Sequence, residues 1–204
     1  MKKWRCKVCN YIHEGDNPPD KCPLCGVGPD EFELIGEVAN DSGMTLEERE
    51  AAKKAIYKIS YGLYIVTSPK GDQINGQVCN TAFQITSDPM RVAIGINKNN
   101  LTGEYIQASG VFAINILSKE NHSLIRRFGF RSGREFNKFK NINYSIGKTG
   151  SPILEDALAY LECSLLSDKV IDCGTHWLFV ADVVAGKLQN NAEPMTYDYY
   201  RKTK

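Results

Sequence analysis

The sequence has no excess of charge of either sign and no long apolar run. Its 204 residues include 25 Lys and Arg against 24 Asp and Glu, a formal net charge of +1 at pH 7. Proteins that bind nucleic acid or lie on an anionic membrane surface generally carry a basic excess, so this balance argues against both roles. No apolar run approaches the roughly 20 residues that a membrane-spanning helix needs. We therefore expect a protein that binds neither nucleic acid nor membrane.

Two further sequence signals are missing. No Gly-x-Gly-x-x-Gly motif opens a βαβ unit, so a Rossmann-type nicotinamide site is not indicated. The segment from Met1 to Cys6 contains basic residues but is not followed by an apolar stretch, so we expect no secretory signal. The sequence also contains no internal repeat and no low-complexity run. Without a membrane span or a secretory signal, we expect a cytoplasmic protein.

Cysteine, in contrast, is abundant. Among the seven cysteines, Cys6 and Cys9 form one Cys-x-x-Cys pair, and Cys22 and Cys25 form a second. In a cytoplasmic chain such pairs are metal ligands rather than disulfides. Each pair can wrap one edge of a tetrahedral metal, and four thiolates leave no open position for a substrate. The four residues therefore predict a structural metal site or an electron relay.

The residues around the pairs help to choose between these two roles. Trp4, Tyr11 and Phe32 are the apolar side chains available to form the core of so short a module. Residues 1–35 resemble rubredoxin, and more closely the abbreviated rubredoxin-like module of rubrerythrins. The resemblance implies one iron atom bound by the four cysteines. Because tetrahedral sulfur suits zinc equally well, a zinc ribbon is the alternative.

A polar, glycine-containing linker is expected at residues 36–44, and it would span roughly 30 Å when extended. Thr45 and Glu48 then fit a capping box, which predicts a helix over residues 47–59. A main domain of about 160 residues buries roughly 70% of its unfolded surface, so it needs no metal to hold its core. The expected domains are a metal module (1–35), the linker (36–44) and a main domain (45–204).

Short apolar runs, rich in Val, Ile, Phe and Tyr and broken by turn residues, fill the stretch from Tyr61 to Ser118. This pattern is typical of successive β-strands with tight connections. The expected strands lie near 62–68, 73–80, 91–97 and 111–117, and the expected helices near 101–108 and 122–129.

Two long antiparallel strands are expected between Ala157 and Leu188, joined around Asp172 to Thr175. Six side chains of this hairpin would mostly face a core: Leu161, Cys163, Leu165, Leu178, Val180 and Val183. The aromatic tail, from Met195 to Arg201, is expected to dock on the main domain. Cys79, Cys163 and Cys173 are left over after the metal assignment and are expected to be free thiols.

Polar residues crowd the segment from Asn75 to Gln84, which is flanked by core-like residues. Buried polar groups need partners, and a bound polar heterocycle would supply them. Directly downstream, the segment from Asn97 to Glu104 opens a predicted helix with a cation, amides and a hydroxyl that suit a phosphate. The two segments together indicate a phosphorylated heterocyclic cofactor.

This order of features resembles the flavin reductase-like family of split β-barrel FMN-binding domains, over roughly residues 45–201. The resemblance rests on an ordered set of segments: 61–67, 75–86, 88–89, 98–102, 112–117 and 174–176. It implies a mainly β fold, in which a small rubredoxin-like metal module precedes a split β-barrel flavin-binding domain with a few helices.

Flavin binding needs a phosphate site, hydrogen bonds to the pyrimidine edge and a flat apolar slot. With FMN as the implied cofactor, residues 98–102 would hold the phosphate and residues 80–84 the pyrimidine edge. The candidate cofactor-binding residues are Asn80, Thr81, Ala82, Phe83, Gln84, Lys98, Asn99, Asn100 and Thr102. Asn and Thr before a helix are also common caps, so ordinary turn chemistry is the alternative for the phosphate group.

The resemblance also places Gly174, Thr175 and His176 near the flavin face. His176 is the candidate catalytic residue, either in contact with a transiently bound nicotinamide or tuning the flavin. A structural histidine on a hairpin is the alternative.

A glycine-containing basic segment around residues 126–134 includes four arginines. Its charge could steer an anionic cofactor or partner, or could simply be solvated. The four residues are Arg126, Arg127, Arg131 and Arg134.

Joined on one chain, the two sites predict an electron path. A hydride delivers two electrons at once, whereas a single thiolate-bound iron cycles by one, and FMN can accept the pair and release the electrons singly. We therefore expect an NAD(P)H-dependent flavin reductase and rubredoxin-type oxidoreductase that passes electrons from NAD(P)H through FMN to iron and on to an external protein acceptor.

The two-module composition resembles the high-molecular-weight rubredoxins. This resemblance implies a flavodiiron protein that reduces oxygen or nitric oxide as the acceptor, and the split-barrel family implies a homodimer. One alternative is a flavoredoxin-like electron carrier that does not oxidise NAD(P)H itself. A second is a zinc-ribbon interaction protein on an empty barrel.

Overall fold

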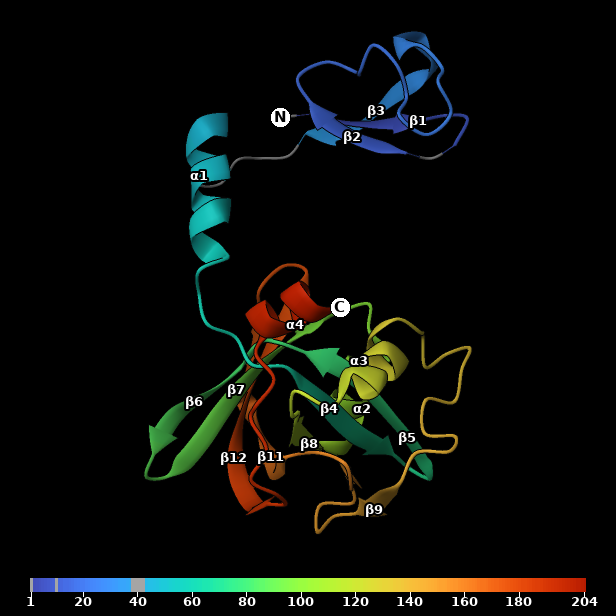
Figure 1. The fold of residues 1–204 in the computed structure, drawn as a ribbon. Helices are drawn as coiled ribbons and strands as arrows, with labels where there is room; N and C mark the ends of the chain where they lie inside the picture. Colours follow the sequence, from blue (N-terminus) through green and yellow to red (C-terminus); the bar gives the residue numbers. More distant parts are fainter. Residues whose placement is uncertain (1, 10, 38–42) are drawn as a thin grey trace. The chain divides into compact units, whose positions relative to one another are not determined.

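The computed structural model describes residues 2–9, 11–37 and 43–204. The chain forms two compact units, Met1–Ile59 and Ser60–Lys204 (Figure 1). The strand-rich architecture confirms the mainly β fold expected from the sequence. No helix in the described ranges is long and apolar enough to cross a membrane.

The first unit contains a three-stranded antiparallel sheet with the strand order β2-β1-β3. Its strands and its short 3₁₀ helix are β1 (Lys2–Cys6), β2 (Ile12–Gly15), η1 (Pro29–Glu31) and β3 (Phe32–Glu37). Phe32 is buried against Cys6 and Cys22, and Trp4 and Tyr11 pack on this cluster. The three aromatic residues predicted to form the core of the module therefore do so.

Helix α1 (Leu46–Ile56) begins with the predicted capping box. The hydroxyl of Thr45 accepts a hydrogen bond from the backbone N–H of Glu48, and the Glu48 carboxylate accepts one from the backbone N–H of Thr45. The helix ends three residues before the expected position 59. Within the expected linker, residues 36 and 37 belong to β3, and residues 38–42 lie outside the described residues.

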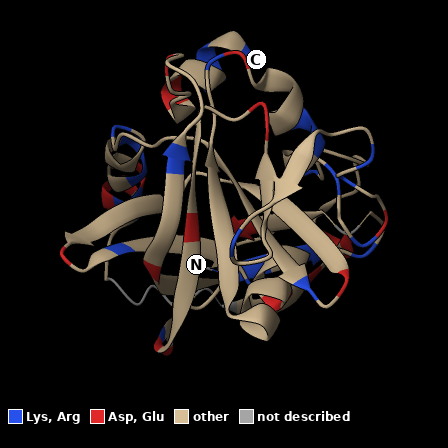
Figure 2. Cartoon of the chain, turned by 90° about the horizontal axis from the view of Figure 1, so that it is seen from below, with Lys and Arg blue, Asp and Glu red and all other residues tan. Residues whose placement is uncertain are grey.

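The second unit is built on a seven-stranded antiparallel sheet with the order β5-β4-β8-β11-β12-β7-β6. The strands are β4 (Tyr64–Lys70), β5 (Gln73–Cys79), β6 (Ala82–Ser87), β7 (Met90–Asn97), β8 (Val111–Ile116), β11 (Ala159–Asp172) and β12 (His176–Leu188). Figure 2 shows that charged residues concentrate at strand ends, helices and loops, while most of the strand surface is uncharged. The long hairpin of β11 and β12 is the one predicted.

The helices of this unit are α2 (Leu101–Ser109), α3 (His122–Gly129) and α4 (Tyr197–Thr203). The first two match their predicted positions. Three strands have no counterpart among the predicted ones: β6, and the pair β9 (Tyr144–Ile146) and β10 (Pro152–Leu154). The pair forms a small separate sheet.

The aromatic tail docks as predicted. The backbone N–H of Met195 donates to the carbonyl of Leu117, and the N–H of Leu63 donates to the carbonyl of Met195. Met195 and Tyr200 are buried in one of the two hydrophobic clusters of the unit, together with Phe128 of α3. The tail therefore completes the core instead of lying loosely on it.

The buried face of β12 differs in part from the expected one. Leu161, Cys163, Leu165 and Val183 belong to or pack against the second hydrophobic cluster, as predicted. Leu178 and Val180 are only half-buried, and Phe179 and Ala181 take their place in that cluster. The prediction was wrong for these two residues, because consecutive apolar residues leave the alternation of the strand undefined.

Candidate functional site

The four predicted metal ligands gather at one point of the first unit. All four Sγ atoms of Cys6, Cys9, Cys22 and Cys25 lie within 4.8 Å of one another. The Cys6–Cys25 sulfur distance is 3.6 Å, and the Cys9–Cys22 distance is 3.4 Å. A tetrahedral metal with bonds of about 2.3 Å to sulfur separates its ligands by about 3.8 Å. The donor set therefore fits one tetrahedral metal ion.

The local backbone shapes both halves of this cluster. The N–H of Cys6 donates to the carbonyl of Tyr11, and the N–H of Cys22 donates to the carbonyl of Val27. Gly26 has φ of +75°, which closes the second turn in a conformation that favours glycine. Each Cys-x-x-Cys pair is thus held in a tight turn that directs two sulfurs to the same side.

Ionisation of the thiols is uneven. Burial opposes ionisation of Cys22, but hydrogen bonds from the backbone N–H groups of Cys25 and Leu24 lower its pKa to about 6. The backbone N–H of Tyr11 favours the Cys9 thiolate, yet burial and hydrogen bonds with the other thiols raise the pKa of Cys9 to about 12. Cys22 therefore ionises more readily than Cys9, and a metal cation would favour the thiolate at all four positions.

One edge of the cluster reaches the surface. Cys6 and Cys22 are buried, Cys9 is half-buried and Cys25 is exposed. The residues that precede the two outer cysteines in the chain are apolar and exposed: Val8, and Leu24 with 71% of its surface accessible. A metal bound here would have no open coordination position.

The second group of predicted residues meets at one end of three neighbouring strands, β6, β7 and β12 (Figure 1). Ala82 at the start of β6 pairs with Ile94, and the carbonyl of Thr81 accepts from the N–H of Gly95. His176 at the start of β12 pairs with Asn97 at the end of β7. Segments 80–82, 97–100 and 174–176 therefore lie at the same end of the sheet.

Lys98 links the β7 end to the β11–β12 turn. Its backbone N–H donates to the carbonyl of Thr175 at 3.0 Å. Its Nζ forms an ion pair with Asp172 and lies 4.3 Å from the ring centroid of Trp177. The hydrogen bond from Lys98, together with one from the Gly174 N–H, lowers the pKa of Asp172. The Lys98 ammonium group is thus held in a defined position, but it is already paired with the Asp172 carboxylate.

His176 is exposed and oriented by its neighbours. Its Nδ1 lies 2.8 Å from the hydroxyl of Thr175, and its carbonyl accepts from the N–H of Cys173. In the described part of the chain, no hydrogen bond engages Nε2. The ring can therefore present Nε2 to a molecule bound at this end of the sheet.

The predicted phosphate residues do not all share one environment. Asn99 and Asn100 are exposed just before α2, and the Asn100 side chain makes no capping hydrogen bond. Thr102 is only 1% exposed, and its hydroxyl accepts a hydrogen bond from Asn75. The lysine and the two asparagines can face a ligand, whereas the Thr102 hydroxyl is committed to the interior.

A small apolar cavity of about 300 Å³ adjoins β6. Three of the predicted pyrimidine-edge residues line it: Ala82, Phe83 and Gln84. The remaining lining residues are Tyr64, Met90, Val92, Ile114, Ile116, Leu161 and Val183, none of which sequence reasoning had assigned to the site. They come from five strands, and no local sequence signal marks them. The cavity provides the apolar slot that a planar ring needs.

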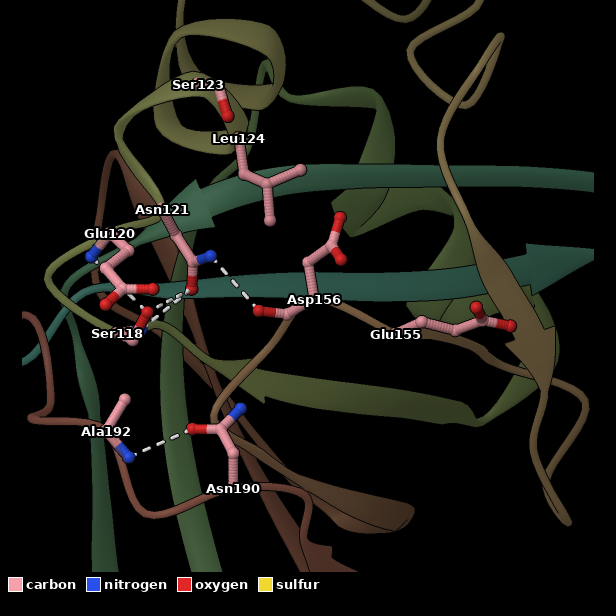
Figure 3. Close-up of a pocket in the computed structure, with 9 residues that line it drawn as sticks. All are labelled: Ser118, Glu120, Asn121, Ser123, Leu124, Glu155, Asp156, Asn190 and Ala192. Atoms are coloured by element: carbon pink, nitrogen blue, oxygen red, sulfur yellow. Dashed lines mark hydrogen bonds between the residues drawn. The ribbon is translucent and has the colours of Figure 1, made fainter.

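A polar cavity of about 590 Å³ lies between the end of β8, the start of α3 and the chain segment before α4 (Figure 3). Asn121 bridges it by donating to the carbonyl of Asp156, and its amide oxygen accepts from the N–H of Ser118. Glu120, Glu155 and Asp156 line the cavity. Their negative charge disfavours an anionic cofactor in this cavity.

Comparisons with known protein families divide the chain in the same way. The model described as "Flavin reductase like domain" matches residues 56–204, and the model described as "Rubrerythrin, rubredoxin-like domain" matches residues 4–33.

Among curated proteins, the chain is 52% identical over 153 residues to the "High molecular weight rubredoxin" of Moorella thermoacetica, covering 74% of this chain and 66% of that protein. It is 44% identical over 150 residues to the "Ferric-chelate reductase (NAD(P)H)" of Archaeoglobus fulgidus, covering 72% of this chain and 88% of that protein. The chain thus spans slightly less than two thirds of the Moorella protein.

Solved structures give the same fold for the second unit. The flavin reductase HpaC complexed with NADP⁺ superposes with a TM-score of 0.63 at 28% identity, covering 73% of this chain and 92% of that one. The FMN-binding protein from Thermus thermophilus with bound 1-cyclohex-2-enone superposes with a TM-score of 0.61 at 26% identity, covering 65% and 73%.

Proposed function

The chain belongs to the flavin reductase-like family and carries a rubredoxin-like module, and on that premise we propose that it is an NAD(P)H-dependent oxidoreductase. Electrons would pass from NAD(P)H through FMN to a four-cysteine iron site and on to an external acceptor. The observation that carries this proposal is the presence on one polypeptide of a closed four-thiolate cluster, of a cation, Lys98, at the end of β7, and of an apolar cavity beside β6.

The residues of the second site suit the three parts of FMN. Lys98, Asn99 and Asn100, beside the start of α2, would hold the phosphate, because a cation and a helix N-terminus both favour an anion. Segment 80–84 would bind the pyrimidine edge, and the apolar cavity would hold the ring. Bound FMN supplies the conversion of a two-electron donor into single-electron steps. Thr102 would support this site from the interior, through Asn75, instead of touching the phosphate.

His176 would orient the nicotinamide. Its ring is exposed, Nδ1 is held by Thr175, and Nε2 can contact a substrate at the end of the sheet. Because no Rossmann motif occurs in the sequence, NAD(P)H would be a transient substrate and not a resident cofactor. The relatives whose names include NAD(P)H and NADP⁺ support this assignment.

The metal module would exchange electrons across its exposed edge. Four thiolates leave no site for a substrate, so the metal can only change its oxidation state or hold the fold. The rubredoxin-like match supports iron over zinc. Apolar Val8 and Leu24 beside Cys9 and Cys25 would let a partner approach the metal closely without a salt bridge to break.

The acceptor would be a protein. The likeness to a high-molecular-weight rubredoxin supports a flavodiiron protein that reduces oxygen or nitric oxide. A homodimer and a cytoplasmic location belong to the same proposal, and the seven unpaired cysteines fit a reducing compartment.

Anaerobic rapid mixing with NADH and with NADPH tests the proposed enzyme. We expect the FMN absorbance to bleach, followed by loss of the red colour of the ferric tetrathiolate. If neither nucleotide bleaches the flavin on the timescale of turnover, the protein does not oxidise NAD(P)H. If the preparation is colourless, it holds neither cofactor.

The second candidate function is a flavoredoxin-like electron carrier that another protein reduces. The pairing of Lys98 with Asp172 favours it, because a cation already neutralised attracts a dinucleotide less strongly. In that case the flavin would be reduced by a reduced partner protein but by neither nucleotide.

A further inference from the structure

A larger cavity, separate from the proposed flavin site, opens beside α3 and α4. Its volume is about 820 Å³, within the range of sites that hold drug-sized ligands. Its lining residues are His122, Ser123, Arg126, Arg127, Phe130, Arg131, Phe136, Tyr200 and Lys204. None of them lines the apolar slot beside β6, so this cavity is a second, independent feature of the same unit.

The charge of this cavity is strongly one-sided. Three arginines and a lysine line it, and the lining includes no Asp or Glu. Within the described ranges, Arg126 and Arg131 form no ion pair with a carboxylate, whereas Arg134 nearby in the sequence is paired with Glu104. Cations concentrated in a concave site and left unneutralised attract an anion.

Arg127 is hydrogen-bonded to backbone carbonyls in the wall of the cavity. Its Nε donates to the carbonyl of Lys138 at 2.9 Å, and its guanidinium also donates to the carbonyl of Lys140. The guanidinium groups of Arg127 and Arg131 lie 4.7 and 4.6 Å from the ring centroid of Phe136. Arg127 therefore fixes the wall, and Phe136 positions Arg131 at the cavity.

The cavity also offers aromatic surface. Phe130 is 70% exposed, although a phenylalanine side chain gains much by burial. Tyr200 is buried beneath, with its ring 5.6 Å from that of His122. A planar aromatic group could stack on Phe130 while its anionic end reaches the arginines, which bind phosphate oxygens in a fork.

We propose that this cavity binds a nucleoside phosphate, with the base on Phe130 and the phosphates on Arg126 and Arg131. The ligand could be a free nucleotide, or the adenosine phosphate half of a dinucleotide such as NADPH or FAD. A concave site with an aromatic wall fits this chemistry better than it fits an extended acidic protein surface. The proposal does not depend on the flavin site, because the two share no residue.

Isothermal titration of the full-length protein, with FMN saturating, tests the proposal with ADP, 2′,5′-ADP, adenosine and inorganic pyrophosphate. We expect ADP or 2′,5′-ADP to bind, and the double variant Arg126→Gln/Arg131→Gln to lose at least about tenfold in affinity, as expected when hydrogen bonds to charged groups are removed. Phe130→Leu should weaken ADP several-fold and leave pyrophosphate unchanged. Arg49→Gln on α1 removes the same charge elsewhere and should change nothing.

The arms of the experiment separate the sources of the ligand. Binding of 2′,5′-ADP at least tenfold tighter than ADP would identify NADPH, and displacement of ADP by FAD would identify the flavin dinucleotide. Three results would overturn the proposal. The first is no saturable binding of either nucleotide, and the second is equal affinity for ADP in the double variant and in Arg49→Gln. The third is pyrophosphate binding as tightly as ADP, together with an unchanged ADP affinity in Phe130→Leu. Binding of polyglutamate but of no nucleotide would also overturn it and would point to an acidic protein partner.

Discussion

The substitution Lys98→Met tests whether the junction between β7 and α2 holds the FMN phosphate. The Nζ atom lies over the ring of Trp177 and is paired with Asp172, so its position is largely fixed before a ligand arrives. A hydrogen bond between charged groups contributes about 1.5–3 kcal/mol. We therefore expect Lys98→Met to weaken FMN binding about ten- to hundredfold. Because the Met side chain still packs on Trp177, the substitution removes mainly the charge.

Asp172 provides a matched control. Its carboxylate engages the same Nζ that a phosphate would need. An exposed ion pair shifts an equilibrium by at most about fivefold. Asp172→Asn is thus expected to strengthen FMN binding by up to about fivefold, and to have a smaller effect when Lys98 is already Met.

Quenching of flavin fluorescence in apoprotein titrations, at fixed ionic strength, measures these affinities. Riboflavin, which lacks the phosphate, should bind wild type and Lys98→Met equally. If Lys98→Met bound FMN as tightly as wild type, or lost affinity for FMN and riboflavin alike, the phosphate would lie elsewhere.

Three other substitutions test the remaining parts of the account. Cys22→Ser should lose iron and the red ferric colour while NAD(P)H still reduces FMN, which iron analysis and absorbance would measure; a retained red colour would refute the four-cysteine site. His176→Ala should slow flavin reduction by NAD(P)H about three- to tenfold, the effect of one hydrogen bond, with FMN content unchanged; an unaltered rate would make His176 structural. Lys138 is 5% exposed, its Nζ donates to the carbonyls of Gly76 and Phe128, and burial lowers its pKa to about 8. Because the unfolded chain keeps this proton up to about pH 10.4, the unfolding free energy of wild type should rise between pH 8 and 10 relative to Lys138→Met; equal slopes in urea titrations would contradict this.

The metal module was predictable because its determinants are local. The four ligands lie within 20 residues, and the spacing of the pairs alone brings them to one centre. Its core was equally constrained, because so short a segment offers few apolar side chains besides Trp4, Tyr11 and Phe32. Neither inference needed a contact between distant parts of the chain.

The buried face of β12 shows where pattern reasoning fails. Residues 177–181 are apolar without interruption, so a period of two cannot choose a face. In the structure β12 pairs with β7 in an unbroken register from His176 to Asp182, and Phe179 and Ala181 face the core. Which face is buried is decided by these contacts between strands and has no signature in the local sequence.

The clustering of the candidate flavin-binding segments was predictable, but their contacts were not. Segments 80–84, 98–102 and 174–176 were identified from composition and resemblance, and sheet pairing brings their ends together. The pairing of Lys98 with Asp172 and of Thr102 with Asn75 joins residues 74 and 27 positions apart. Only the folded chain determines that the lysine is shared and that the threonine faces inward.

One measurement tests the proposed electron transfer from flavin to iron most directly. The flavin of the intact protein is reduced under anaerobic conditions with a limiting amount of NADPH or NADH, and the absorbance of the ferric tetrathiolate is followed. The account predicts that the red colour disappears after the flavin is reduced, in the isolated protein or on addition of the acceptor protein. A fully reduced flavin beside a persistently ferric centre, in both samples, would contradict it.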